Sequence, residues 1–210
     1  TTVSWISISV ASDARASAGP HGRTGQAVSR RVAVALVHHP VVDRQGAIVT
    51  TAVTNLDVHD IARSAHTFGV SDFFIVHPIT AQRELVSRIR EHWVDGSGAR
   101  RIPDRKPAME RVRIVSALED VVTALGEAEL WVTSAAPGGT LDYAAARERL
   151  RIEGPPVILC FGTGWGLAPE VVDGAAARLT PIRSPRVDGY NHLSVRAAAA
   201  ITLDRLLGVT

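Results

Sequence analysis

The sequence predicts one α/β domain built on a mostly parallel sheet flanked by helices, and three observations support this prediction. Short apolar runs alternate along the chain with segments of helical periodicity, which is typical of parallel strands joined by covering helices. The chain has 210 residues and a mass of 22.4 kDa, enough to bury one full core but too little for two large domains. Hydrophobic residues make up 46% and charged residues 21%, the profile of a globular protein.

Six strands and six helices are expected. The expected strands are residues 32–38, 72–77, 112–116, 129–134, 156–161 and 178–182. The expected helices are residues 55–68, 81–93, 118–125, 141–150, 169–176 and 191–207. The last helix stops at Gly208, a residue type that suits the left-handed position after a helix end. No stretch approaches the roughly 18 to 20 apolar residues of a membrane span, so we expect no membrane attachment.

Residues 1–30 are expected to form a disordered leader outside the domain, which would span residues 31–210. They are rich in Ser, Ala, Gly, Thr and Arg and show no sustained periodicity, the composition of an unfolded segment. Arg30 and Arg31 superficially resemble a twin-arginine export signal. However, the apolar run that follows has only six residues and ends in His38-His39-Pro40, which favours a first buried strand.

The helix expected over residues 55–68 carries the first candidate site residues. Thr54 and Asp57 can form its N-terminal cap, which gives Asp57 a structural role. Arg63 lies eight residues beyond Asn55, a little over two helical turns, so the amide and the guanidinium can share one face. The alternative interpretation of Arg63 is an ordinary surface arginine.

The segment 96–113 is the most basic part of a chain whose formal net charge is +2. Its six basic residues stand against Asp104 and Glu110 only: Arg100, Arg101, Arg105, Lys106, Arg111 and Arg113. Such a patch can contact phosphate, and the alternative is a solvated loop with a few ion pairs.

A glycine-rich loop, residues 161–167, follows the strongly apolar run 156–160. Alternating glycines let the backbone turn sharply and approach a ligand closely, with free amide donors. A tight turn needs such glycines for steric reasons as well. A Rossmann fingerprint would follow the first strand and be answered by an acidic residue about 20 positions later. This loop follows the fifth strand, and Thr180 to Arg183 stand at that distance, so a Rossmann site is not expected.

The segment 190–201 opens with polar residues and continues into four alanines at 197–200. A helix start offers unsatisfied amide donors that favour a polar or anionic ligand, and alanines let other backbone pass closely. The alternative is a good helix former packed in the core.

The histidines and the single cysteine argue against a metal site. His59 and His66 are seven residues apart, too far for one-turn chelation, and His38 and His39 point to opposite faces of a strand. Cys160 cannot form an internal disulfide, so a reducing cytosol is the default compartment. Within an apolar strand, Cys160 is more consistent with a small core residue than with a nucleophile.

Three strings in this order resemble the SPOUT superfamily of knotted RNA methyltransferases. They are T-A-V-T-N-L-D-V-H-D-I-A-R at 51–63, G-T-G-W-G-L at 162–167 and N-H-L-S-V-R-A-A-A-A-I at 191–201. The match is closest to a bacterial group of small, stand-alone proteins and covers about residues 31–208. It implies a deep trefoil knot near the C-terminus, a homodimer, and methyl transfer from S-adenosylmethionine to tRNA or rRNA in the cytoplasm. Knots are the exception to un-knotted connectivity.

The resemblance also implies which residues hold the cofactor. In such enzymes S-adenosylmethionine lies bent in a cleft of knotted loops and contacts mainly backbone groups. The implied cofactor residues are Thr133, Ser134, Ala135, Gly162, Thr163, Gly164, Trp165, Gly166, Leu167, Pro181, Ile182, His192, Leu193 and Ser194. The alanines at 197–200 would then let the last helix pass through a narrow loop.

On the acceptor side, the resemblance implies that Asn55 and Arg63 act in catalysis. They match an asparagine and an arginine near the acceptor in the ribose-methylating branch. Arginine is a poor base because of its pKa, so Arg63 is expected to orient a phosphate or the acceptor oxygen. Arg100, Arg101, Arg105 and Lys106 are the candidate RNA contacts.

The sequence also departs from the known branches. His192 stands where the ribose-methylating branch has an asparagine, and the aspartate-centred loop and C-terminal domain of the guanine-N1 branch are missing. The acceptor atom therefore stays open. Two other functions are considered: an RNA-binding module of the same fold without catalysis, and a Rossmann-type nucleotide enzyme.

Overall fold

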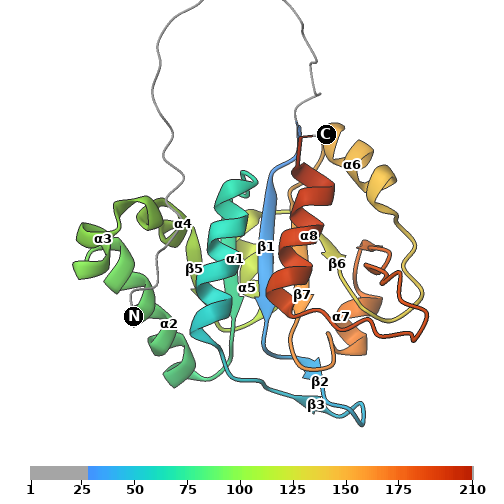
Figure 1. The fold of residues 1–210 in the computed structure, drawn as a ribbon, viewed down its shortest axis with the longest axis horizontal. Helices are drawn as coiled ribbons and strands as arrows, with labels where there is room; N and C mark the ends of the chain where they lie inside the picture. Colours follow the sequence, from blue (N-terminus) through green and yellow to red (C-terminus); the bar gives the residue numbers. More distant parts are fainter. Residues whose placement is uncertain (1–27, 210) are drawn as a thin grey trace, which may run out of the picture.

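The computed structural model describes residues 28–209, so residues 1–27 of the expected leader lie outside it. One sheet of six parallel strands forms the centre of the molecule (Figure 1). Its strands are β1 (Val32–Val37), β4 (Asp72–Val76), β5 (Val112–Val115), β6 (Glu129–Val132), β7 (Val157–Gly162) and β8 (Ala177–Arg178). They lie in the order β5-β4-β1-β7-β6-β8. The predicted α/β class and parallel sheet are confirmed.

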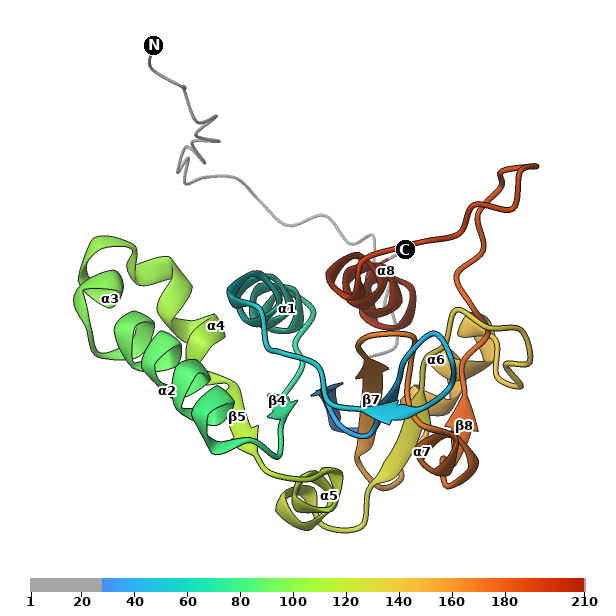
Figure 2. The same cartoon turned by 90° about the horizontal axis from the view of Figure 1, so that it is seen from below.

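Helices cover both faces of the sheet (Figure 2). One face carries α1 (Asn55–Thr67), α2 (Thr80–Val94), α4 (Lys106–Glu110), α6 (Tyr143–Arg151) and α8 (Val195–Leu207). The other carries α5 (Leu118–Leu125) and α7 (Pro169–Asp173). All six residues of β1 are buried, with Leu36 in the first core and Val37 in the second. A central strand covered on both faces must be apolar throughout, which explains the continuous run of residues 32–37.

The strand order differs from the Rossmann order in one respect. Numbered along the chain, the parallel strands of a Rossmann sheet lie in the order 3-2-1-4-5-6. Here the fifth parallel strand, β7, lies beside β1, and the fourth, β6, lies outside it. The glycine-rich loop after β7 is therefore brought to the centre of the sheet, and the Rossmann alternative does not fit this topology.

Several element boundaries differ from the sequence predictions. The strand expected over 178–182 ends at Arg178, after which Thr180 N donates to Leu141 O at 2.9 Å instead of continuing a ladder. The last helix begins at Val195 rather than 191, because Ser194 caps it and accepts a hydrogen bond from Ala197 N. The helix expected over 169–176 ends at Asp173.

Gly208 does not adopt the left-handed conformation expected of it. Its φ is −61°. A Cβ at this position would lie 2.4 Å from Asp204 O, so close packing against the last helical turn accounts for glycine here.

A hairpin and several short helices were not predicted from the sequence. Strands β2 (Val41–Val42) and β3 (Ile48–Val49) form an antiparallel hairpin after β1. The segment expected as a basic loop folds into α3 (Ser97–Arg101), the 3-10 turn η1 (Pro103–Arg105) and α4. Elements of two to five residues are too short to show a period.

Ser29 and Arg30, which we expected to precede the domain, pack against it. Ser29 N donates to Leu150 O at 3.0 Å. Arg30 is 6% exposed, and its Nη2 lies 2.9 Å from Glu129 Oε1.

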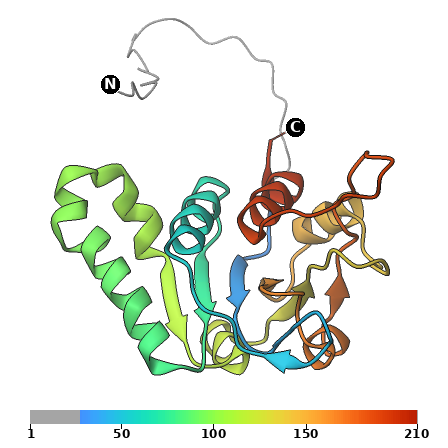
Figure 3. The same cartoon turned by 60° about the horizontal axis from the view of Figure 1, so that its bottom comes forward.

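The chain after β8 passes through a narrow space beside the loop that joins β6 to α6. Leu179 N donates to Val132 O at 2.9 Å, and a Cβ at Gly139 would lie 2.4 Å from Leu179 O. The chain then returns across the sheet to α8 (Figure 3). The trefoil knot itself stays a prediction, and this close passage supports it. No helix within residues 28–209 is long and apolar enough to cross a membrane.

Candidate functional site

The predicted cofactor loops after β6 and β7 and the segment that leads into α1 lie at the carboxyl edge of the sheet, around β1 and β7. The glycine-rich loop follows β7, Thr133 follows β6, and α1 begins after the hairpin that follows β1. The connection that follows β1 leads to β4, on one side of the β1–β7 pair, and the connection that follows β7 leads to β8, on the other side. Open parallel sheets bind ligands where their connections diverge in this way.

The glycine-rich loop is held in place by backbone hydrogen bonds to strand β2. Val42 exchanges hydrogen bonds with this loop, accepting from Trp165 N at 3.0 Å and donating to Gly166 O at 2.9 Å. Gly164 and Gly166 have φ of +60° and +119°, which side-chain-bearing residues rarely adopt. Gly162 has no room for a side chain, because its Cβ would lie 2.6 Å from Leu167 N.

A chain of hydrogen bonds links the same loop to the end of β1 and the segment before α1. His38 Nδ1 lies 3.1 Å from Thr51 Oγ1, which lies 2.5 Å from Thr163 Oγ1, and Thr163 donates to Val37 O at 3.1 Å. Burial, together with the neighbouring His77, lowers the pKa of His38 to about 4. His38 is therefore neutral at physiological pH and completely buried, which suits a structural support for the loop rather than a proton-transferring group.

The N-terminus of α1 is capped as predicted. Thr54 Oγ1 accepts from Asp57 N at 3.2 Å and donates to Asp57 Oδ2 at 2.6 Å. Asn55 is exposed in the first turn of the helix. The side chain of Arg63 is 59% exposed, and its only ion pair within residues 28–209 is with Asp60 at 3.9 Å. The structure thus leaves both predicted catalytic side chains accessible, with no hydrogen bond between them among residues 28–209.

An ion pair joins the N-termini of α1 and α8. Arg196 Nη1 lies 2.7 Å from Asp57 Oδ1, whose side chain is 8% exposed, and Arg196 Nε lies 3.5 Å from Asp60 Oδ2. The pair holds the turn that carries Asn55 against the start of α8, next to residues 192–194. Asp57 and Arg196 are 139 positions apart, and the sequence offered no signal for their pairing.

A cavity of about 310 Å³ lies beside the glycine-rich loop. Five of the predicted cofactor residues line it: Thr133, Ser134, Trp165, Gly166 and Leu167. Ala136 lines it in place of the expected Ala135. Sequence reasoning also missed Asp173 at the end of α7 and Arg178 at the end of β8, which complete its wall.

The other predicted cofactor residues do not line this cavity. The conformation of the loop depends on Gly162, Thr163 and Gly164, through the contacts described above. Pro181, Ile182, His192 and Leu193 lie on the excursion between β8 and α8, where Asn191 Nδ2 donates to Ile182 O at 2.9 Å. The side chain of Ser194 serves as the cap of α8.

The four predicted RNA contacts lie on a small helical cap next to α2. A Cβ at Gly98 would lie 2.8 Å from Trp93 Cε3, so α3 packs directly on the end of α2. Arg105 stacks over the Trp93 ring at 4.4 Å, and Lys106 Nζ lies 3.8 Å from Glu110. Arg100 and Arg101 are exposed and form no ion pair within the described chain.

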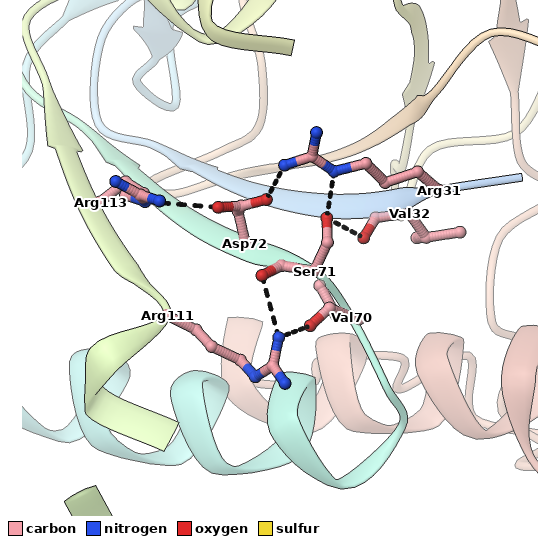
Figure 4. Close-up of polar contacts among 7 residues, drawn as sticks. All are labelled: Arg31, Val32, Val70, Ser71, Asp72, Arg111 and Arg113. Carbon is pink, nitrogen blue, oxygen red and sulfur yellow. Dashed lines mark hydrogen bonds and ion pairs between the residues drawn. The ribbon is translucent and has the colours of Figure 1, made fainter. Parts of the chain in front are cut away.

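Two other arginines of the basic segment have structural roles at the amino ends of the strands, on the side of the sheet opposite to the glycine-rich loop (Figure 4). Arg113 Nε lies 3.3 Å from Asp72, which also receives a 2.5 Å contact from Arg31. Arg111 donates to the carbonyls of Val70 and Ser71 at 3.1 Å. Burial opposes the ionisation of Asp72, but hydrogen bonds from Arg31 and Ser71 and the charges of Arg31 and Arg113 together outweigh it and lower the pKa of this carboxyl.

The described chain holds no group of three or more His, Cys, Asp or Glu side chains that could bind a metal ion. Cys160 is fully buried, and burial raises the pKa of its thiol to about 12. The thiol is therefore protonated at physiological pH and is unsuited to nucleophilic attack.

Among proteins of known sequence, relatives are found for most of the chain. A tRNA (guanine-N(1)-)-methyltransferase of Nitratidesulfovibrio vulgaris is 45% identical over 183 residues, which are 85% of this chain and 42% of that protein. The chain thus spans less than half the length of this relative. An uncharacterized protein of Aquifex aeolicus is 34% identical over 185 residues, or 89% of its length.

Solved structures share the fold. A probable methyltransferase of Bordetella pertussis has a TM-score of 0.56 and 16% identity, covering 85% of this chain and 95% of that one. The SpoU methyltransferase AviRb of Streptomyces viridochromogenes has a TM-score of 0.52 and 15% identity, covering 84% of this chain and 58% of that one. At these identities the likeness shows the fold.

A family model gives the assignment. The model described as SAM-dependent RNA methyltransferase matches residues 31–208, a range that includes the glycine-rich loop, α1 and α8. This chain therefore belongs to the family of SAM-dependent RNA methyltransferases.

Proposed function

We propose that this chain transfers the methyl group of S-adenosylmethionine to a nucleotide of tRNA or rRNA. The observation that carries the proposal is the glycine-rich loop, which is fixed at the carboxyl edge of the sheet beside a cavity and is joined through Thr51 to the segment that leads into α1. A methyl donor bound there would lie at the same edge of the sheet as the start of α1, the proposed acceptor-binding helix. Aligning donor and acceptor is the main requirement of such a transfer.

The residues of the cavity fit the cofactor. A Cβ at Gly166 would meet no atom within 4 Å, so the loop backbone faces open space on the ligand side. Backbone of residues 133–135 and 162–167 would hold the cofactor, together with 181–182 and 192–194 on the returning segment. When bound, S-adenosylmethionine supplies a methyl group activated by the positive sulfonium.

On the acceptor side, Asn55 and Arg63 would orient the RNA. Both are accessible on α1, and the Asp57–Arg196 pair fixes their helix relative to the start of α8. Arg63 would bind a phosphate or the acceptor oxygen, since a guanidinium presents several donors and stays charged at physiological pH.

We further propose that the active form is a cytoplasmic homodimer. Large apolar side chains are exposed near the starts of α1 and α8, where Leu56 is 60% and Leu193 is 43% exposed. In the proposed dimer, these two side chains would be buried by the second subunit. A second subunit would also bring cofactor to the accessible Arg63, as the family resemblance implies.

The Nitratidesulfovibrio relative favours tRNA as the acceptor. Its name specifies tRNA and guanine N1, but the chain spans only 42% of that protein. The named base and atom describe that longer protein, so we carry over the RNA class alone.

Transfer of tritiated methyl groups tests the function directly. Purified protein is incubated with labelled S-adenosylmethionine and, separately, with tRNA and rRNA lacking the native modification. Labelled tRNA, with little label in rRNA, is the expected result. Binding of cofactor without transfer to any RNA would reject the enzyme and favour the catalytically silent RNA-binding module.

Replacing Arg100 and Arg101 with alanine is expected to weaken RNA binding and flatten its salt dependence. Each arginine–phosphate interaction that is lost should reduce the slope of log K against log salt by about 0.7 to 0.9, so the double variant can lose up to about twice that amount. Fluorescence anisotropy over a salt series measures both quantities. Arg151→Ala, which removes an arginine paired with Glu148 on α6, is the matched control. An unchanged slope in the double variant would remove the helical cap from the RNA interface.

A further inference from the structure

The cavity beside the glycine-rich loop carries two opposite charges that do not pair with each other. Arg178 and Asp173 both line it. Neither side chain forms an ion pair with any residue from 28 to 209. Within the described residues, the cavity therefore presents one positive and one negative group that no ion pair neutralises.

Arg178 is also only partly satisfied. Its Nη2 donates to Pro137 O at 3.1 Å, whereas its Nε is buried without a hydrogen-bond partner. The rest of the guanidinium packs against Gly138, where a Cβ would lie 3.5 Å from Nη1. A partly buried guanidinium without a carboxylate is costly, and an anionic ligand group would compensate that cost.

The remaining wall is mainly apolar and carries two hydroxyl groups. Leu167, Val172 and Pro169 provide the apolar part. Thr133 Oγ1 donates to Cys160 O, and Ser134 Oγ accepts from Ala136 N, so each hydroxyl retains further hydrogen-bonding capacity. A short aliphatic chain ending in both charges would match such a surface.

We propose that Arg178 and Asp173 bind the amino-acid end of the methyl donor. A carboxylate on the guanidinium can form a bidentate, charge-assisted contact, and the α-ammonium group would face Asp173. The cofactor's methionine part carries both charges on one carbon, which is the zwitterion that this pair of side chains fits. This inference rests on the proposed function, because it assigns the orientation of the same cofactor.

Two ligands separate the amino-acid end from the nucleoside. S-adenosylhomocysteine carries the amino-acid group, and 5′-methylthioadenosine lacks it. We expect Arg178→Gln to weaken S-adenosylhomocysteine binding by about 10-fold or more, the effect of removing a hydrogen bond to a charged group. Binding of 5′-methylthioadenosine should change less than about twofold, the scale of a remote surface substitution. Isothermal titration calorimetry measures both affinities.

Matched variants make the test decisive. Arg183→Gln, an exposed arginine on the same segment that does not line the cavity, should leave both affinities unchanged. Arg178→Lys retains the charge and should restore part of the affinity for S-adenosylhomocysteine. Asp173→Asn tests the ammonium contact at an exposed position where the fold is not at stake.

Three outcomes overturn the inference. If Arg178→Gln leaves S-adenosylhomocysteine binding intact, Arg178 does not bind the amino-acid end, although the proposed function stands. The same holds if both ligands lose affinity equally, because the effect is then on the loop as a whole. If the wild-type protein binds neither ligand, the proposed function fails together with the inference.

Discussion

Replacing Arg63 with alanine is expected to slow methyl transfer by about 100- to 1,000-fold, the range seen when one preorganised donor is removed from an active site. The side chain is 59% exposed, and its only ion pair in the described chain is a 3.9 Å contact with Asp60. Its removal should therefore cost little folding free energy. Arg63 does not line the cavity, so we expect S-adenosylhomocysteine affinity to be nearly unchanged. Single-turnover transfer and calorimetry measure the two quantities.

Two further variants serve as controls for the Arg63→Ala measurement. Arg88→Ala removes an exposed arginine from α2 and should leave transfer within about twofold of wild type. Arg63→Lys keeps the charge but loses the bidentate geometry, so we expect partial activity. Near-normal turnover by Arg63→Ala would reject a catalytic role for this residue.

Replacing Gly162 with alanine is expected to lower cofactor affinity by about 5- to 150-fold, because overpacking costs about 1 to 3 kcal/mol and about 1.4 kcal/mol corresponds to a tenfold change in affinity. The new Cβ would lie 2.6 Å from Leu167 N and 2.8 Å from the carbonyl carbon of Gly166. These are backbone atoms, so no side-chain rotation can relieve the clash. The loop must shift, and its hydrogen bonds to Val42 would break.

A thermal melt alongside the titration separates loop damage from unfolding. Gly174→Ala, at φ −79° after α7, is the matched control, since its Cβ meets only Glu170 O at 3.3 Å. It should retain both stability and affinity. Wild-type S-adenosylhomocysteine binding by Gly162→Ala would show that the glycine-rich loop is not part of the cofactor site.

Local signals in the sequence predicted the main elements well. The apolar runs of β1 and β7 are continuous because both faces of these strands are buried, and the Thr54–Asp57 cap was predicted from its spacing. Burial and capping are decided within a few residues. Such features can be inferred without knowing the rest of the fold.

Features that depend on distant segments could not be predicted in this way. The exchange of β6 and β7 relative to a Rossmann sheet leaves no trace in periodicity and was not predicted. Arg196 meets Asp57 across 139 positions, and Arg178 reaches the cavity from a strand of two residues. The basic segment shows the same limit. Its arginines look alike in the sequence, but in the structure Arg111 binds backbone carbonyls and Arg113 pairs with Asp72. Arg100 and Arg101, by contrast, are exposed.

The most direct test of the central claim is a calorimetric titration of the wild-type protein with S-adenosylhomocysteine, with NAD and ATP as controls. It requires no knowledge of the RNA. The account predicts micromolar binding of S-adenosylhomocysteine and none of the other two. Absence of binding by folded, dimeric protein, or a preference for NAD or ATP, would contradict it.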